Sequence, residues 1–326
     1  MTVTPLTAPP TDADADAWLG VLAAAQAVDL PGLPAPSRVE TAGRIQVPPA
    51  RGRAVCLAAT DGDEGPAGDW AGLAGLLLFS DPGNTHTAFL DVLAVRPDAR
   101  RRGVGTALWE RVRAELAADR RSSVSTVVDL GGPGEAFAAG LGFENVLPMA
   151  WYVQDTAEPR EVPALPEGYR FAGWSGIAPD EYAWPAAVAH AAMEDAPSGG
   201  MDEQPPQWDA EKLRAAQRLI LDRGGRLHTM CVLTGAGEVA AYTELVLPDP
   251  ATPRAIQYDT VVVPEHRGHG LGRAVKLRAL AELRELHPGV RQIATTVADE
   301  NTAMRAVNAS LGYRHERACA VFQHTL

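Results

Sequence analysis

The chain contains 326 residues, 46% of them hydrophobic and 21% charged, which excludes disorder throughout and suits about two soluble domains of ~100–200 residues each. The formal net charge of −12 argues against nucleic-acid binding, and three cysteines without CxxC spacing argue against a disulfide framework or a metal site. The first residues lack a secretory signal and no run reaches the ~18 apolar residues of a membrane span, so we expect a cytoplasmic protein without membrane contact.

The first half of the chain predicts an ordered series of three strands, a helix, a strand, a short helix and a last strand. Gly or Pro turns separate the β-rich runs, and the longer helix has apolar residues near the helical period. In chain order, these segments are residues 51–59, 72–79, 85–95, 103–118, 125–130, 135–141 and 143–152.

Residues 154–168 carry three prolines and four acidic residues, a composition typical of an exposed, stiff linker. The sequence therefore predicts one domain at residues 1–153 and a second at residues 169–326. A run of strands followed by strand, helix and strand predicts an α+β fold with a mixed, mostly antiparallel sheet. The second domain repeats the order of the first in residues 226–233, 239–247, 255–263, 270–285, 292–297, 301–311 and from 313 onward.

Two glycine-rich loops correspond to each other at an offset of 167 residues. A second landmark, Leu-Gly followed by an aromatic residue, recurs at an offset of 170 in residues 141–143 and 311–313. Matching landmarks in the same order indicate two copies of one fold. The corresponding loop residues are Pro97 and Pro264, Arg100 and Arg267, Gly103 and Gly270, and Gly105 and Gly272.

The loop at residues 267–273 has the features of an anion-binding site between a strand and a helix. Its glycines allow close approach of the backbone to a ligand, and the free amides and dipole of the following helix favour phosphate oxygens. The loop lacks the Lys-Ser/Thr of a Walker loop and does not follow GxGxxG, so a pyrophosphate-bearing carrier fits it better than a nucleoside triphosphate. A tight turn without a ligand is the alternative, against which the recurrence of the loop at residues 100–105 argues.

The two loops resemble the signature of the GCN5-related N-acetyltransferase (GNAT) superfamily, Arg/Gln-x-x-Gly-x-Gly/Ala, which residues 100–105 and 267–272 both match. A later motif of that family is recognisable in residues 301–313. The chain is thus similar to a tandem GNAT protein, a layout shared with mycothiol synthases. The resemblance implies two α+β domains, each with a splayed central strand pair flanked by helices. It also implies an N-acetyltransferase that transfers an acetyl group to a small amine by direct attack in a ternary complex.

The resemblance also implies where acetyl-CoA, the cosubstrate, would bind. It would lie between splayed strands at residues 255–263 and 292–297, with its pyrophosphate on the loop and its thioester carbonyl polarised by a backbone amide. The implied binding residues of the second half are Val261, Val262, Val263, Arg267, Gly268, His269, Gly270, Leu271, Gly272, Arg273, Asn301 and Asn308. Those of the first half are Val95, Arg100, Arg101, Arg102, Gly103, Val104 and Gly105.

Acetyl transfer to an amine also needs a group that accepts the amine proton. Glu244 and Asp259 are the candidates, because an acidic side chain within an apolar strand is costly to bury unless it is used or paired. A solvated face or a structural ion pair is the alternative for both. His228, His266 and His269 are further candidates, although the last two belong to the loop and are expected to face solvent or phosphate.

The proton donor for the departing thiolate is less evident. The tyrosine that the family usually supplies is replaced by Asn308 in the second half and by Ala138 in the first. Tyr313, another residue or water would then protonate the thiolate. Because Gly131 also replaces the motif residue Asn301 in the first half, we expect that half to be degenerate, binding CoA or serving structure alone, with catalysis in the second half.

The acceptor is expected to bind at residues 180–211. Acidic and aromatic side chains there suit a cationic small-molecule amine through charge and cation–π attraction, whereas ordinary surface helices are the alternative. The missing tyrosines leave a non-catalytic acyl-CoA sensor as an alternative function. The acceptor candidates are Tyr182, Trp184, His190, Met193, Glu194, Asp195 and Trp208.

Overall fold

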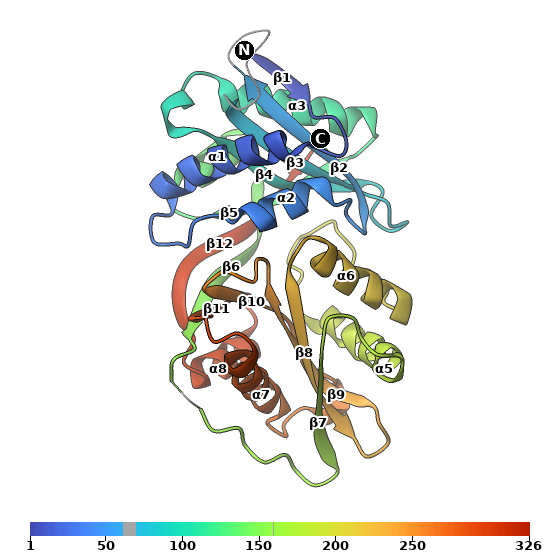
Figure 1. The fold of residues 1–326 in the computed structure, drawn as a ribbon. Helices are drawn as coiled ribbons and strands as arrows, with labels where there is room; N and C mark the ends of the chain where they lie inside the picture. Colours follow the sequence, from blue (N-terminus) through green and yellow to red (C-terminus); the bar gives the residue numbers. More distant parts are fainter. Residues whose placement is uncertain (61–69, 159) are drawn as a thin grey trace. The chain divides into compact units, whose positions relative to one another are not determined.

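The computed structural model describes residues 1–60, 70–158 and 160–326, and the chain forms two compact units (Figure 1). Neither unit is continuous in the sequence. Unit 1 comprises residues 1–148, 199–206 and 319–326, and unit 2 comprises residues 149–198 and 207–318.

Unit 1 contains a mixed sheet between two layers of helices. Its neighbouring strands pair antiparallel, except that β4 and β5 are parallel. The strands, in spatial order, are β1 (Thr2–Pro5), β2 (Gly52–Thr60), β3 (Trp70–Phe79), β4 (Thr87–Val95), β5 (Ser123–Asp129) and the end of β12 (Arg314–Thr325).

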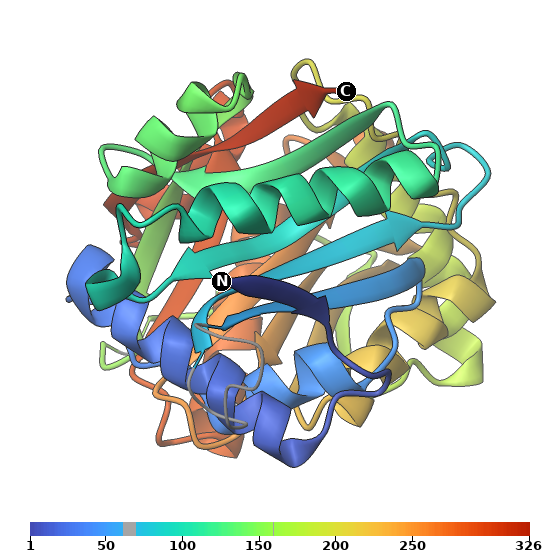
Figure 2. The ribbon, with the colours of Figure 1, turned by 90° about the horizontal axis from the view of Figure 1, so that it is seen from above.

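The helices of unit 1 form two separate hydrophobic cores. α1 (Asp12–Asp29) and α2 (Arg38–Gln46) share one core around Trp18. α3 (Val104–Ala118) and α4 (Pro133–Gly140) share the other, which includes Leu108. Figure 2 shows α3 lying over one face of the sheet.

Unit 2 has the same arrangement. α5 (Asp180–His190) and α6 (Ala210–Asp222) contribute to one hydrophobic core. α7 (Leu271–Leu286) contributes to the other, and α8 (Thr302–Ser310) packs against it. Its neighbouring strands are antiparallel except for β10 and β11. In spatial order they are β6 (Glu144–Asp155), β11 (Gln292–Ala298), β10 (Arg254–Val262), β9 (Val239–Leu247), β8 (Arg226–Thr234) and β7 (Tyr169–Ser175).

The two halves of the chain exchange their last strands. Residues 149–155 of β6 pair with β11 of unit 2, from Asp155 opposite Gln292 to Met149 opposite Ala298. Residues 319–325 of β12 pair with β5 of unit 1. The units therefore differ from the expected boundaries at 153 and 169, because each sheet is completed by a strand from the other half.

The parallel strand pair of each unit is splayed, as the resemblance implies. In unit 2, β10 and β11 pair only from Arg254–Ile256 to Gln292–Ala294. In unit 1, β4 and β5 pair only from Thr87–Phe89 to Ser123–Ser125. Beyond these residues the two strands have no common register, and we call each divergent part the wedge of its unit. The α+β fold with mixed sheets is thereby confirmed.

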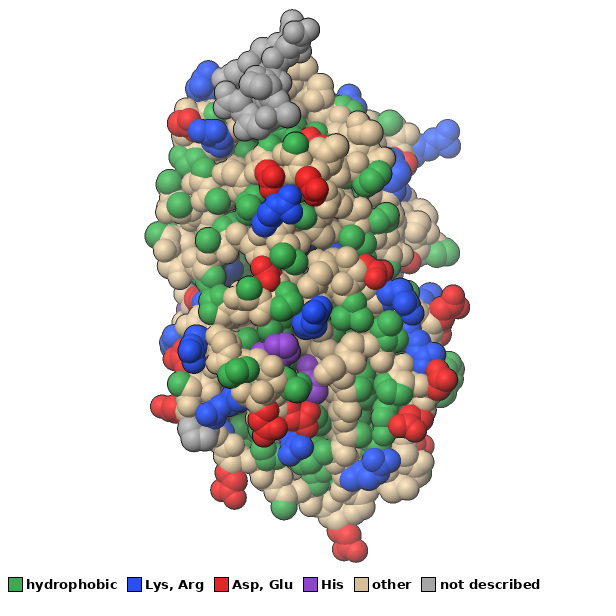
Figure 3. Space-filling view, in the orientation of Figure 1, with side chains coloured by type: hydrophobic (Ala, Val, Ile, Leu, Met, Phe, Trp, Pro, Cys, Tyr) green, Lys and Arg blue, Asp and Glu red, His purple; other side chains and the backbone are tan. Residues whose placement is uncertain are grey.

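The surface carries mixed charge. On the face shown in Figure 3, acidic and basic side chains alternate over the described residues, which fits ion pairs such as Arg278 with Glu282 at 2.9 Å. Within the described ranges, no helix has the length and apolar character needed to cross a membrane.

Candidate functional site

The loop that precedes α7 has a backbone shaped to present amides. Gly268 and Gly270 have φ values of +82° and +73°, in the left-handed region that a Cβ disfavours, and Gly270 is the N-cap of α7. A Cβ built on either residue would meet no atom within 4 Å, so the loop faces open space. Successive amides turned by such residues, at the positive end of a helix dipole, form a concave site for an anion.

Unit 1 has the same loop conformation before α3. Gly103, the N-cap of α3, has a φ of +86°, and Arg101 has a φ of +60° where unit 2 has Gly268. A non-glycine residue in this region is uncommon, so the shared backbone geometry is a property of the loop and not of glycine alone. Both copies therefore keep the anion-binding shape.

The side chain of the first arginine of each loop makes hydrogen bonds within the protein. Arg267 donates from Nε to the Val262 carbonyl at 3.1 Å and from Nη2 to Asp195 Oδ2 at 2.6 Å. Arg100 donates to the Val95 carbonyl at 3.2 Å and to both carboxylate oxygens of Asp29 at 2.7 Å. The exposed side chains of Arg101, Arg102 and Arg273 lie in these loops, where the loop amides also offer positive groups to a phosphate.

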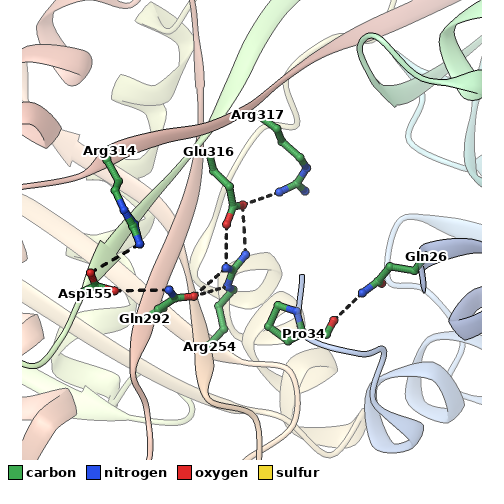
Figure 4. Close-up of polar contacts among 8 residues, drawn as sticks. All are labelled: Gln26, Pro34, Asp155, Arg254, Gln292, Arg314, Glu316 and Arg317. Carbon is green, nitrogen blue, oxygen red and sulfur yellow. Dashed lines mark hydrogen bonds and ion pairs between the residues drawn. The ribbon is translucent and has the colours of Figure 1, made fainter. Parts of the chain in front are cut away.

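The closed end of the unit 2 wedge is held by a side-chain network (Figure 4). Arg254, at the start of β10, donates to Gln292 Oε1 at 2.7 Å and to Glu316 Oε1 at 2.8 Å. Its side chain is only 12% exposed, so this charge-assisted pair is well shielded from water. The network fastens β10 to β11 on one side of the split and leaves the other side to diverge.

The unit 1 wedge encloses a cavity of about 370 Å³. Leu90 and Val92 of β4, Thr126 and Val128 of β5, and Phe137 of α4 contribute to its walls. That volume lies within the range of ~300–1,000 Å³ of small-molecule sites. The first copy, expected to be degenerate in its later motif, thus retains an open wedge as well as its loop.

A β-bulge places two acidic residues together where the unit 2 strands diverge. Gln257 pairs with Leu245 and Thr260 pairs with Thr243, so Tyr258 and Asp259 both lie opposite Glu244. Unit 1 has an equivalent bulge, in which Asp91 is the extra residue. The constant offset of 167 residues between the two halves would instead make Val92, the next residue, the counterpart of Asp259. Asp91 is ion-paired with Arg44 at 3.1 Å, and β3 contains no acidic residue.

Glu244, Asp259 and His190 form a cluster in unit 2. His190 Nε2 donates to Asp259 Oδ2 at 2.9 Å. Glu244 is 7% exposed and accepts from Gln217 Nε2 at 3.1 Å and from Thr229 Oγ1 at 3.3 Å. All three residues are candidates from the sequence, but the contact between His190, in the acceptor segment, and the two acids is not predicted by it.

Burial and the charge of Asp259 shift the pKa values of Glu244 and His190. Burial, followed by the charge of Asp259, raises the pKa of Glu244 to about 7. Burial alone would lower the pKa of His190, but the hydrogen bond and charge of Asp259 outweigh it, so this pKa is raised. A buried carboxyl with a pKa of about 7 can exchange a proton near neutral pH, which makes Glu244 a candidate for proton transfer.

Aromatic side chains surround the cluster. The His190 ring stacks on Trp208 with centroids 4.1 Å apart and lies 5.8 Å from Tyr242. Among the described residues, His190 Nδ1 and the Tyr242 hydroxyl are buried without a hydrogen-bond partner. Trp174 stacks on Tyr182 at 5.2 Å. This wall has the chemistry expected of a site for a cationic amine.

Among the described residues, the other candidates of the acceptor segment form no hydrogen bond or ion pair with the Glu244–Asp259–His190 cluster. The side chain of Trp184 is 63% exposed, and Asp195 pairs with Arg267. Met193 packs on the core that includes Trp174. The side chain of Glu194 lies outside the described residues.

The alternative histidines are engaged elsewhere in unit 2. His228 contacts Glu282 at 2.8 Å and Ser175 at 3.2 Å. His266 contacts the Tyr169 hydroxyl at 2.9 Å, and His269 is exposed beside the His266 carbonyl. None of these contacts involves Glu244 or Asp259.

The motif residues at the end of the chain have structural contacts. Asn301 caps α8 by accepting from the Met304 amide at 3.0 Å. The Tyr313 hydroxyl is buried and donates to Gln257 Oε1 at 2.5 Å. Burial raises the pKa of Tyr313 far above its ordinary value, which makes it a poor proton donor.

Sequence reasoning missed Lys276, which is buried beside Asn308. Its Nζ donates to Asn308 Oδ1 at 2.5 Å and lies 4.8 Å from the centroid of the Tyr313 ring. The available signal was composition, since only two of the 29 basic residues are lysines and this one lies within an apolar helix.

Comparisons with known proteins agree with this architecture. The family model described as "Acetyltransferase (GNAT) family" matches residues 34–143 and 187–313. A mycothiol acetyltransferase from Geodermatophilus obscurus is 32% identical over 277 residues, covering 82% of this chain and 81% of that protein. Another from Salinispora arenicola is 28% identical over 236 residues, covering 72% of each.

Solved structures extend the similarity to the whole chain. A tandem GNAT protein from the clavulanic acid biosynthesis pathway has a TM-score of 0.83 at 29% identity, covering 99% of this chain and 98% of that one. A GCN5-related N-acetyltransferase from Sphaerobacter thermophilus, with a TM-score of 0.68 at 18% identity over 99% and 95% of the two chains, shows the shared fold. The chain therefore belongs to the GNAT acetyltransferase family, as a tandem N-acetyltransferase.

Proposed function

We propose that unit 2 transfers the acetyl group of acetyl-CoA to the amine of a small molecule, by direct attack while both substrates are bound. The observation that carries this proposal is the Glu244–Asp259–His190 cluster at the bulge where β10 and β11 diverge. A proton acceptor and a diverging strand pair at one place are what attack on a bound thioester requires.

The residues present suit the acyl donor. Its pyrophosphate would rest on the amides of residues 268–273 and beside Arg273. The Val263 amide donates to the Ala240 carbonyl on β9, so alternation along the strand turns the amide of Val262 toward the wedge. A fixed amide at that place can polarise the thioester carbonyl, a contribution valued at ~3 kcal/mol in other enzymes.

The acid cluster supplies the acceptor side. The Asp259 side chain is 35% exposed, so it is the carboxylate that an incoming ammonium group can reach. Glu244 lies opposite it in the bulge and holds a proton near neutral pH. Asp259 would bind the ammonium and take its proton, and the neighbouring Glu244 would share that proton. The curated relatives are named mycothiol acetyltransferases, so their acceptor belongs in any panel of amines.

Unit 1 is proposed to hold acyl-CoA without transferring its acetyl group. Its loop conformation and its cavity support binding. Its β3 strand lacks an acidic residue, and Asp91 is occupied by Arg44, so the proton acceptor of unit 2 has no equivalent there.

The test measures release of CoA thiol from acetyl-CoA over a panel of amines, together with the number of CoA molecules bound. Gly270→Glu places a carboxylate in the unit 2 loop and should lower turnover at least ~100-fold, with one CoA site lost. Gly103→Glu should remove the other CoA site while turnover persists. Gly176→Glu is the matched control, since its φ of +77° imposes a similar backbone cost where β7 ends, beside the His228–Glu282 contact near the far end of α7. Loss of turnover in Gly103→Glu alone would overturn the assignment of the active half.

A further inference from the structure

Lys276 is an amine buried in the core of unit 2. It lies on α7, is 4% exposed, and contacts Asn308 and the Tyr313 ring. No carboxylate among the described residues forms an ion pair with it, so burying its charged form is energetically unfavourable. Burial lowers the pKa of Lys276 to about 7, so it can both hold and release a proton near neutral pH.

The partner of Lys276 is also incompletely satisfied. Asn308 is 1% exposed, its Oδ1 accepts from Lys276 Nζ, and its Nδ2 has no acceptor among the described residues. An unpaired buried donor costs about 1–3 kcal/mol. Two neighbouring side chains thus keep N–H groups available in the core, which is the arrangement of a site for an electron-rich atom.

This pair lies next to the point where β10 and β11 diverge. Lys276 sits over the ring of Tyr313, whose hydroxyl donates to Gln257 Oε1. Gln257 directly follows the last paired residue of β10, and Thr295 Oγ1 of β11 donates to its carbonyl at 3.1 Å. The contacts therefore lead from Nζ to the apex of the wedge.

The acid cluster approaches the same apex from the opposite face of the sheet. Tyr313 belongs to the core that contains α7, whereas Tyr242, beside His190, belongs to the core that contains α5. Acyl transfer to an amine needs proton removal from the nucleophile and proton delivery to the leaving group at separate positions. The two faces offer one group of each kind.

We propose that Lys276 is the general acid of the transfer described above, donating a proton from Nζ to the sulfur that leaves the acetyl carbon. The inference rests on the proposed function of unit 2. As the amine nitrogen bonds to the acetyl carbon, the carbon–sulfur bond breaks and its electron pair remains on sulfur. The Nζ proton passes to that sulfur, and the amine proton passes to Asp259. Lys276 then regains a proton from solvent, so an ammonium acceptor yields amide, CoA thiol and one proton overall.

The chemistry of the neighbours favours Lys276 over Tyr313. A thiol has an ordinary pKa of ~8.5, so an ammonium with a pKa of about 7 transfers its proton to a thiolate with a favourable driving force. Tyr313, in contrast, has its hydroxyl proton committed to Gln257. Asn308 acts as a positioning residue, since its Oδ1 fixes the direction of Nζ.

The first experiment compares Lys276→Met, which keeps an unbranched side chain of nearly the same length without the amine, with Lys276→Arg, which keeps its charge but does not release a proton near neutral pH. Both should lower kcat by ~100-fold or more, with KM for acetyl-CoA and CoA affinity changed less than about threefold. The alkaline limb of the pH profile of kcat should disappear in both. Lys212→Met is the control, because this other lysine is exposed on α6.

Full activity in Lys276→Met, or in Lys276→Arg with an unchanged alkaline limb, would overturn the role of Lys276 as a proton donor. Both variants must bind CoA with wild-type affinity and unfold at temperatures near that of the wild type. Removing a buried charge is expected to leave the fold intact.

A second experiment uses the wild-type chain and does not depend on the folding of a variant. Absorbance of the CoA thiolate near 240 nm is followed against pH for bound CoA. A neighbouring ammonium should lower the pKa of the unit 2 thiol by at least ~1 relative to the thiol of free CoA. An unshifted thiol pKa would overturn this inference while leaving the transferase intact. Failure of the wild type to bind CoA or to acetylate any amine would overturn the proposed function itself.

Discussion

Replacing Glu244 with glutamine should stabilise the protein at alkaline pH while it abolishes most of the activity. The folded chain raises the pKa of this carboxyl from 4.5 to about 7, chiefly by burying it. At roughly 1.4 kcal/mol per pH unit, the ionised form is disfavoured by about 3 kcal/mol relative to the unfolded chain. Glutamine has the same shape without the charge, and its Oε1 can still accept from Gln217 and Thr229.

The sign of the pH dependence follows from the direction of the shift. A carboxyl with a raised pKa contributes stability below pH 4.5 and loses it as the pH rises through about 7. Glu244→Gln should therefore differ from wild type by less than ~1 kcal/mol at pH 5 and by about 2–3 kcal/mol at pH 8. For a unit of this size, that corresponds to roughly 4–12 °C in the melting temperature.

Thermal unfolding followed by circular dichroism at pH 5 and pH 8 measures the difference. Glu238→Gln provides the matched control, since Glu238 is exposed before β9 and the same chemical change there should move neither melting temperature. A Glu244→Gln variant that melts at or below the wild-type temperature at pH 8 would refute the reasoning. It would mean that the buried carboxylate is stabilised and not penalised, and the case for Glu244 as a functional group would fail with it.

Three further predictions concern other parts of the molecule. Asp259→Asn should lower the pKa of His190 toward its ordinary value in an NMR titration of the ring, since Asp259 holds that pKa up; an unmoved titration would contradict the pairing. Deleting residues 319–326 should destabilise unit 1 by at least ~3 kcal/mol and expose the β5 amides to hydrogen exchange, whereas intact protection of β5 would exclude the strand exchange. Cys231, whose pKa burial raises to about 12, should resist iodoacetamide at pH 8 until the chain unfolds, and rapid labelling of the native protein would contradict its burial.

The loops could be predicted from the sequence because their geometry is local. Gly268 and Gly270 adopt positive φ for reasons that involve only neighbouring residues, so the spacing of glycines carries the information. Glu244 and Asp259 were likewise visible as charges within apolar strands. What their spacing did not show is the bulge that sets both Tyr258 and Asp259 opposite Glu244, since this depends on the register between two strands.

Contacts between distant segments could not be predicted in this way. His190 and Asp259 lie 69 residues apart and meet only because α5 packs on the sheet. Lys276 and Asn308, 32 residues apart, meet because α7 and α8 cover the same face. In each pair, the chemistry arises from burial and from a partner that the local sequence pattern does not specify.

The exchange of strands gives a physical reason for the chain to keep a first copy that lacks the acid cluster. β11 forms one wall of the unit 2 wedge, and its outer neighbour is residues 149–155 of β6, which belong to the first half. Gln154 in that strand donates to the Leu311 carbonyl at 2.7 Å in a buried position, next to α8. A second half without β6 would leave β11 as an open edge and the end of α8 without this bond. The first copy can therefore lose residues needed for acetyl transfer, but it cannot lose the strand that completes the wedge of the other copy.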